Sequence, residues 1–148
     1  MFKKMLLPLD GSEFSERALE VGVELASKLG IPVVITHIID QSMFESMLTP
    51  VPGGPYAMAK PVYDDMRKEA EAFLKGKEEL CRQRGVKCDA IVRMGHPVNT
   101  ILDLVEEMEI GLVVLGSHGR GRVTGIALGS VSYGVVHKAH NISILVVR

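Results

Sequence analysis

The sequence predicts an α/β fold built around a parallel sheet, and two observations carry this prediction. Short runs of apolar residues alternate along the chain with stretches in which apolar residues recur every three or four positions. The runs are almost continuously apolar, as expected for strands covered on both faces, and the three-to-four spacing indicates amphipathic helices. Because alternating strands and helices form βαβ units with right-handed crossovers, the strands should lie parallel.

Five strands and four helices are expected. The strands, rich in leucine and β-branched residues, cover 5–9, 33–39, 88–94, 112–115 and 143–147. The helices show their periodic apolar residues over 14–29, 62–81, 98–108 and 131–139. Gly30 and Pro32 end the first helix. Gly85 follows the second, and Pro97 precedes the third. We find no internal repeat and expect one domain over 1–148.

The composition excludes several classes of protein. Of the 148 residues 47% are hydrophobic and 24% are charged, and the net charge of −1 gives no basic face for nucleic acid. The first apolar run breaks at Pro8 and Asp10, too early for a signal peptide, and no run approaches the about 18 residues of a membrane span. Cys81 and Cys88 make neither a disulfide framework nor a zinc site. We therefore expect a cytoplasmic protein with free thiols, without nucleic acid or membrane as a partner.

Residues 41–61 interrupt the alternation of strands and helices. They contain four prolines, two glycines and three methionines. A connection of this length is unusual inside a domain. We expect a loop insert here, which would serve as a functional lid, as a contact to a partner or as a disordered segment.

The most informative stretch is LGSHGRGRVTGIALGS, residues 115–130, which contains five glycines. It begins at the carboxyl end of the fourth expected strand and ends where the fourth helix starts. Open parallel sheets bind ligands at this edge, and the free N–H groups and dipole of a helix N-terminus favour an anion such as phosphate. Ser130, at the expected cap position, would bond an N–H group of its own helix or a phosphate oxygen.

Other glycine motifs do not fit this stretch. The Walker A spacing G-x-x-x-x-G-K-[ST] and the nucleophile elbow G-x-S-x-G are absent from the sequence. Gly119, Gly121 and Gly125 miss the dinucleotide spacing G-x-G-x-x-G and follow the fourth strand instead of the first. A flexible loop followed by an ordinary helix cap stays an alternative to a ligand site, because glycine-rich turns are common.

Gly116, Gly119, Gly129 and Ser130 have the spacing G-2x-G-9x-G-[ST] found in the ATP-binding universal stress proteins, and the chain resembles that family outside 41–61. Further matching segments are Pro8-Leu9-Asp10-Gly11-Ser12, His37-Ile38, Gly95-His96-Pro97 and Ile144-Leu145-Val146-Val147. The resemblance implies an open, Rossmann-like sheet of five parallel strands in the order 3-2-1-4-5, with helices on both faces. Strands one and four would then be neighbours at the point where the strand order reverses.

The resemblance also implies a nucleotide site in the crevice between the ends of strands one and four, where Asp10 would face the glycine-rich loop. Gly116 and Gly119 would let the backbone approach the ribose and the phosphates, and residues 129–132 would hold phosphates at the helix start. Asp10 would contact the sugar or a magnesium ion, and Ile38 would pack on the adenine. The remaining members line the loop or flank Asp10. The full set is Pro8, Leu9, Asp10, Ile38, Gly116, Ser117, His118, Gly119, Arg120, Gly121, Arg122, Gly129, Ser130, Val131 and Ser132.

Some of these residues also have a purely structural interpretation. Asp10 would otherwise cap the first helix. His118 would be a phosphate contact, a phosphorylation site or an exposed loop residue. The other histidines show no metal-ligand spacing and are expected to be structural or on the surface. They are His37, His96, His137 and His140.

The resemblance implies an ATP-binding protein (or one that binds AMP or ADP) that acts as a nucleotide-responsive regulatory module in the stress response, with an unknown client protein. No catalytic residue is expected. An enzyme with slow ATP hydrolysis, autophosphorylation or nucleotidyl transfer is the alternative on the same fold. The intact glycine spacing argues against a third function, an interaction protein without nucleotide. The last strand, 143–147, would be an apolar sheet edge, which predicts a homodimer formed by pairing of this strand.

Overall fold

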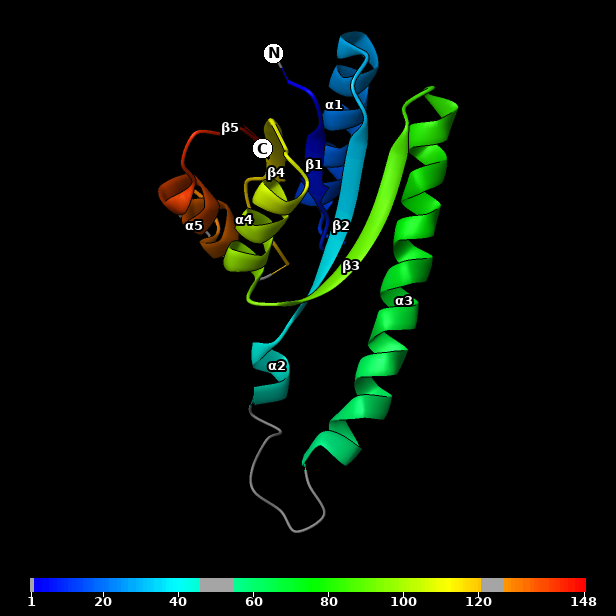
Figure 1. Cartoon of the computed structure of the whole chain (residues 1–148), viewed down its shortest axis with the longest axis vertical. Coiled ribbons are helices and arrows are strands. Elements are labelled where there is room, and N and C mark those ends of the chain that lie inside the picture. The colour runs from blue at the N-terminus through cyan, green and yellow to red at the C-terminus, as the bar shows by residue number, and fades with distance from the viewer. Residues whose placement is uncertain (1, 46–54, 121–126) are drawn as a thin grey trace.

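In the computed structural model, the chain forms an open sheet between two layers of helices (Figure 1). The structure describes residues 2–45, 55–120 and 127–148, with the backbone alone for 55–59. The strands are β1 (Met5–Pro8), β2 (Val33–Asp40), β3 (Cys88–Gly95), β4 (Leu112–Gly116) and β5 (Ser143–Val147). The helices are α1 (Glu13–Leu29), α2 (Ser42–Glu45), α3 (Pro55–Gln83), α4 (Pro97–Glu107) and α5 (Ser130–Lys138). All strand pairs in the described part are parallel, in the order β3-β2-β1-β4-β5, which confirms the predicted fold class.

Each face of the sheet is covered by its own pair of helices. Leu7 contributes to the core under α1 and α3, whereas its neighbour Leu6 contributes to the core under α4 and α5. Both side chains are fully buried. Since successive residues of a strand point to opposite faces, a strand buried on both faces must be apolar at every position. This explains why the apolar runs in the sequence do not alternate.

Helix α3 differs most from the sequence prediction. It begins at Pro55 instead of near Val62, so the last part of the expected loop insert is helical, and α2 follows directly after β2. Proline is well tolerated as the first residue of a helix, where its missing N–H group has no intrahelical partner. Pro61 lies inside the helix, where a proline is unfavourable, and this explains why the sequence predicted a boundary there.

The two cysteines are free, as predicted. Cys81 is fully buried near the end of α3, and Cys88 begins β3 and packs against the same core. A hydrogen bond with Cys81, together with burial, holds the pKa of the Cys88 thiol well above its ordinary value. Cys88 is therefore a neutral thiol at physiological pH. None of the helices in the described ranges has the length and apolar character needed to cross a membrane.

The end of β4 lies against the first turn of α1, and Gly116 makes this approach possible. A Cβ atom on Gly116 would lie 2.7 Å from the carbonyl carbon of Phe14 and 2.8 Å from its oxygen. These are backbone atoms of a helix and cannot move aside as a flexible side chain would. Gly116 thus sets how closely α1 packs on the sheet beside β1.

We predict that Gly116→Ala destabilises the fold by about 1–3 kcal/mol, because the added methyl group overpacks the contact between β4 and α1. Gly76→Ala is the matched control: Gly76 lies inside α3, and its added Cβ would meet nothing within 4 Å. This control should stabilise the protein by about 0.5–1 kcal/mol, since alanine has the better helix propensity. Urea unfolding measures both, and equal stabilities of the two variants would contradict the packing role of Gly116.

Candidate functional site

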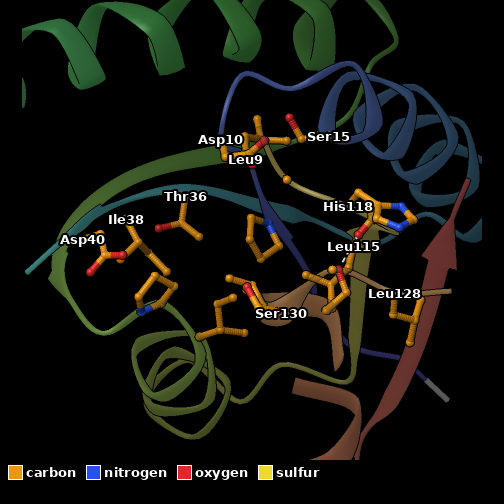
Figure 2. Close-up of a pocket in the computed structure, with 18 residues that line it drawn as sticks. Leu9, Asp10, Ser15, Thr36, Ile38, Asp40, Leu115, His118, Leu128 and Ser130 are labelled. Carbon is orange, nitrogen blue, oxygen red and sulfur yellow. Dashed lines mark hydrogen bonds between the residues drawn. The ribbon is translucent and has the colours of Figure 1, made fainter. Parts of the chain in front are cut away.

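A cavity of about 390 Å³ opens at the carboxyl ends of the central strands, in front of the first turn of α5 (Figure 2). Its volume lies within the range of small-molecule sites in proteins. The cavity is bounded by the ends of β1, β2 and β4, the starts of α1 and α4, and the segment that leads into α5. The lining residues are Pro8, Leu9, Asp10, Ser15, Thr36, Ile38, Asp40, Pro97, Ile101, Leu115, Gly116, His118, Gly119, Leu128, Gly129, Ser130, Val131 and Ser132.

Most residues of the predicted site line this cavity. They are Pro8, Leu9, Asp10, Ile38, Gly116, His118, Gly119, Gly129, Ser130, Val131 and Ser132. Two predicted members, Ser117 and Arg120, lie nearby but are not part of its lining. Gly121 and Arg122 fall outside the described residues.

Asp10 lies directly beside Gly119 of the glycine-rich segment and lines the cavity, on the side expected from the order of the strands. Its Oδ1 atom accepts a hydrogen bond from the Ser12 backbone N–H at 2.9 Å. Its Oδ2 atom points toward Gly119, where an added Cβ would lie only 2.8 Å from this oxygen. The cap of α1 is Ser12, whose Oγ accepts from the Ser15 N–H at 3.2 Å. The carboxylate of Asp10 therefore does not cap the helix, and Oδ2 is directed at the loop.

Two hydrogen bonds from β2 fix the residue before Asp10. The Leu9 N–H donates to the Thr36 carbonyl at 2.8 Å, and the Leu9 carbonyl lies 2.8 Å from Nδ1 of His37. Because a carbonyl only accepts, Nδ1 of His37 carries the proton in this contact. The His37 ring also packs edge-on against Phe73, with 5.9 Å between the ring centres. His37 is thus structural, as predicted, and its contact holds Asp10 in place.

The first turn of α5 presents backbone N–H groups that no side chain caps in the described part of the chain. The cap residue is Gly129, and Ser130 is the first helical residue, so the prediction that Ser130 occupies the cap position was wrong. The Gly129 N–H donates to the Ser117 carbonyl at 2.7 Å. An added Cβ on Gly129 would approach the His118 Cα to 3.1 Å, so glycine lets this turn lie directly on the loop. With no side chain to cap it, the start of α5 leaves backbone N–H groups that can bind an anion in the cavity.

The side chains of Ser117 and Ser132 hold the glycine-rich segment in shape, and the predicted ligand contacts of these two residues stay predictions. Ser117 is buried, and its N–H donates to the Val147 carbonyl at 2.7 Å. Its Oγ lies 2.9 Å from Nδ1 of His118. The buried hydroxyl of Ser132 donates to the Gly116 carbonyl at 2.6 Å. These hydroxyls are thereby committed to protein partners.

Arg120 lies over the turn between β1 and α1. An added Cβ on Gly11, whose φ is +79°, would lie 2.5 Å from Nη2 of Arg120. The guanidinium of Arg120 thus lies at this turn, and its predicted part in nucleotide binding stays a prediction. The reason is that Gly11 leaves an open surface on which the guanidinium packs.

The lining carries negative charge on its side chains. Its ionisable members are Asp10, Asp40 and His118, and neither lysine nor arginine lines the cavity in the described residues. The ring of His118 packs on Phe14, with 5.1 Å between the ring centres. An anionic ligand would therefore be held by backbone N–H groups and the α5 dipole, assisted by a cation bound at Asp10. The described residues contain no cluster of three metal-ligating side chains, so such a cation would need ligand oxygens as well.

Several of the lining residues were not predicted from the sequence. Those missed are Ser15, Thr36, Asp40, Pro97, Ile101, Leu115 and Leu128. Thr36 and Asp40 had a signal: they lie two residues before and after Ile38, so the period of a strand places all three on one face. Pro97 and Ile101 lie four residues apart on α4, the spacing of a single helix face.

The comparisons with known proteins agree with this fold. The sequence signature of the universal stress protein family matches residues 1–148. Universal stress protein YxiE of Bacillus subtilis (strain 168) is 32% identical over 152 residues, which cover 100% of both chains. The solved structure of hypothetical protein MJ0577, from Methanocaldococcus jannaschii, is similar with a TM-score of 0.87 at 27% identity and covers 99% of this chain and 96% of that chain. The chain belongs to the universal stress protein family.

Proposed function

We propose that this protein binds an adenine nucleotide, ATP or its di- or monophosphate, in the cavity at the ends of β1, β2 and β4. Occupancy of the site would act as a regulatory signal in the stress response. The observation that carries the proposal is the uncapped first turn of α5, which lines the same cavity as Asp10. The lining also includes an apolar slot, formed by the side chains of Ile38, Pro97 and Ile101. This arrangement offers an anion site, a sugar or metal contact and a surface for a base, in that order.

The phosphate end of the proposed site lies at Gly119, Gly129 and Ser130. Glycine at 119 and 129 keeps side chains away from the loop, so phosphate oxygens can approach the backbone N–H groups. Asp10 Oδ2 would complete the coordination of a magnesium ion bound by the phosphates, because Mg²⁺ is commonly held by one or two carboxylates together with substrate phosphates and water. The magnesium ion would neutralise phosphate charge beside a carboxylate that otherwise repels it.

The base end is lined by the apolar side chains of Ile38, Pro97 and Ile101. Two universal stress proteins of known structure were determined in complex with cAMP and with dAMP, the latter from Archaeoglobus fulgidus. Both are 21% identical to this chain, with TM-scores of 0.68 and 0.63, a likeness that extends to the fold alone. Support for a nucleotide in this chain therefore comes from its own lining residues.

The residues that line the cavity favour a protein that binds the nucleotide without cleaving it rapidly. Rapid phosphoryl transfer needs a positioned nucleophile and neutralised phosphate charge. No described lysine or arginine lines the cavity, and the His118 ring is already engaged with Phe14 and Ser117. Slow hydrolysis, autophosphorylation or nucleotidyl transfer is the second candidate function, favoured only by the nearness of Asp10 and His118 to the phosphate end.

We further propose that the protein works in the cytoplasm as a homodimer that signals to a client protein. β5 is an edge strand of the sheet, and its Leu145 side chain is 36% exposed. An apolar edge strand is prone to pair with another strand, and pairing with its own copy gives a closed two-fold assembly.

The first prediction of the proposed function concerns the phosphate end. Gly129→Asp and Ser130→Asp place a carboxylate where phosphate should bind, and like-charge repulsion should weaken ATP binding by on the order of several kcal/mol. Ser130→Asp keeps the fold, because an acidic residue in the first turn stabilises a helix. Isothermal calorimetry with Mg-ATP measures the loss.

Gly76→Asp is the control for added charge, because Gly76 lies inside α3 with nothing near its Cβ. It should bind ATP like the wild type. If Ser130→Asp binds ATP as tightly as this control, the phosphate end is assigned incorrectly.

The second prediction is that bound Mg-ATP turns over far more slowly than the about 1–100 s⁻¹ of kinases. A single-turnover assay with excess protein measures ADP formation directly. Release of ADP within seconds, abolished by His118→Ala, would refute the proposal that the protein holds ATP without cleaving it rapidly. It would show instead that the protein is an ATP-hydrolysing enzyme.

The third prediction is a dimer at micromolar concentration, dissociated by Leu145→Lys, because a charge on the edge strand prevents pairing of two apolar edges. Val21→Lys is the control, since Val21 is a similarly exposed apolar residue on α1, at 41%. Sedimentation velocity measures both variants. A monomeric wild type, or a dimer that survives Leu145→Lys, would exclude the β5 interface.

A further inference from the structure

We infer that Asp40 recognises the base: its Oδ2 atom accepts a hydrogen bond from the exocyclic amino group of a purine, so the site selects a 6-aminopurine over a 6-oxopurine. This inference rests on the proposed nucleotide site and adds the chemistry that this site selects. It assigns a role to a carboxylate that the sequence pattern did not single out.

The position of Asp40 is fixed by the sheet. Asp40 is the last residue of β2 and pairs with Gly95 of β3. The next residue, Gln41, donates its N–H to the Gly95 carbonyl at 3.0 Å. Since Asp40 follows Ile38 by two residues, both lie on the face of the sheet that lines the cavity. The backbone therefore presents Asp40 to the same space as the apolar slot.

The orientation of the carboxylate is fixed as well. Oδ1 of Asp40 accepts from the Ser42 N–H at 3.0 Å and from the Ser42 Oγ at 2.8 Å. These two bonds commit one oxygen to the turn that begins α2. Oδ2 makes no hydrogen bond or ion pair with any described residue, so it keeps its capacity to accept.

Asp40 lies at the end of the cavity away from the phosphate site. Figure 2 shows Asp40 and Ile38 at one end and His118 at the other, with Ser130 between them. A nucleotide with its phosphates at the start of α5 would thus extend its base toward Asp40. The hydroxyl of Thr36, the next polar side chain along β2, donates to the Ile91 carbonyl at 2.8 Å. Asp40 is accordingly the one ionisable side chain that the structure describes at this end.

The chemistry of a carboxylate defines what Asp40 selects. An ionised carboxylate only accepts hydrogen bonds. The amino group at position 6 of adenine donates, whereas the carbonyl oxygen at position 6 of hypoxanthine accepts and would be repelled. A hydrogen bond to a charged group is among the stronger ones in proteins. ATP should therefore bind at least about tenfold more tightly than ITP, which has almost the same shape.

The test compares ATP with ITP by calorimetry at constant magnesium, in the wild type and in Asp40→Asn. Asparagine keeps an oxygen for the Ser42 N–H and replaces Oδ2 with an amide NH₂ group, a donor. The preference for ATP should fall by about tenfold and approach equality, because the new donor suits the 6-oxo group. Thermal unfolding verifies that the variant stays folded.

Asp10→Asn is the matched control, because Asp10 makes the same bond to the N–H two residues ahead. It should weaken ATP and ITP alike and leave their ratio unchanged. Equal binding of ATP and ITP by the wild type, or a wild-type ratio in Asp40→Asn, would overturn the inference while leaving nucleotide binding intact. Binding of neither nucleotide by the wild type would overturn the proposed function itself, and the role of Asp40 with it.

Discussion

The site depends on the place of β1 between β2 and β4. Because α1 leaves β1 toward one face of the sheet and α5 follows β4 on the other (Figure 1), the two strand ends lie side by side. Residues at both ends line the cavity, which opens there as a crevice. The crevice brings Asp10 opposite Gly119. Two hydrogen bonds between β2 and Leu9 then prevent the end of β1 from shifting along β2. The geometry of the cavity thus follows from strand pairing, before any contact with a ligand is considered.

The glycines around this crevice serve first of all to allow close packing of the backbone. The absence of a side chain at Gly116 lets the α1 backbone lie close to β4. In the same way, Gly119 lets the Asp10 carboxylate approach, and Gly129 lets the loop backbone approach at His118. In each case a β-carbon would lie 3.1 Å or less from its neighbour. The glycine spacing therefore specifies the shape of the loop, and the capacity to bind an anion follows because that shape leaves the α5 N–H groups uncovered.

The sequence predicted what depends on local pattern and failed where tertiary contacts decide. The strands, and Asp10 opposite the loop, could be predicted because buried strands are continuously apolar and strand ends share one edge of the sheet. The start of α3 could not, since Pro61 contradicts local helix propensity while the described part of α3 packs on the sheet. The direction of the Arg120 side chain stayed open in the sequence, because it depends on a contact with Gly11, a residue far away in the chain.

The charged side chains of the cavity lining suit a site that binds a nucleotide without cleaving it rapidly. A site that stabilises phosphoryl transfer directs fixed positive charge at the transferred group. Here the described lining presents two carboxylates, Asp10 and Asp40, while the attraction for phosphate comes from the dipoles of one helix turn. Neither lysine nor arginine in the described lining adds a side-chain charge to stabilise a leaving phosphate. No described lysine or arginine in the lining pairs with Asp40, so its carboxylate is left to accept a hydrogen bond from a base. Holding and recognising a nucleotide therefore make consistent demands on this cavity. Rapid cleavage would need, besides the proposed magnesium ion, a lysine or arginine side chain that the described lining does not contain.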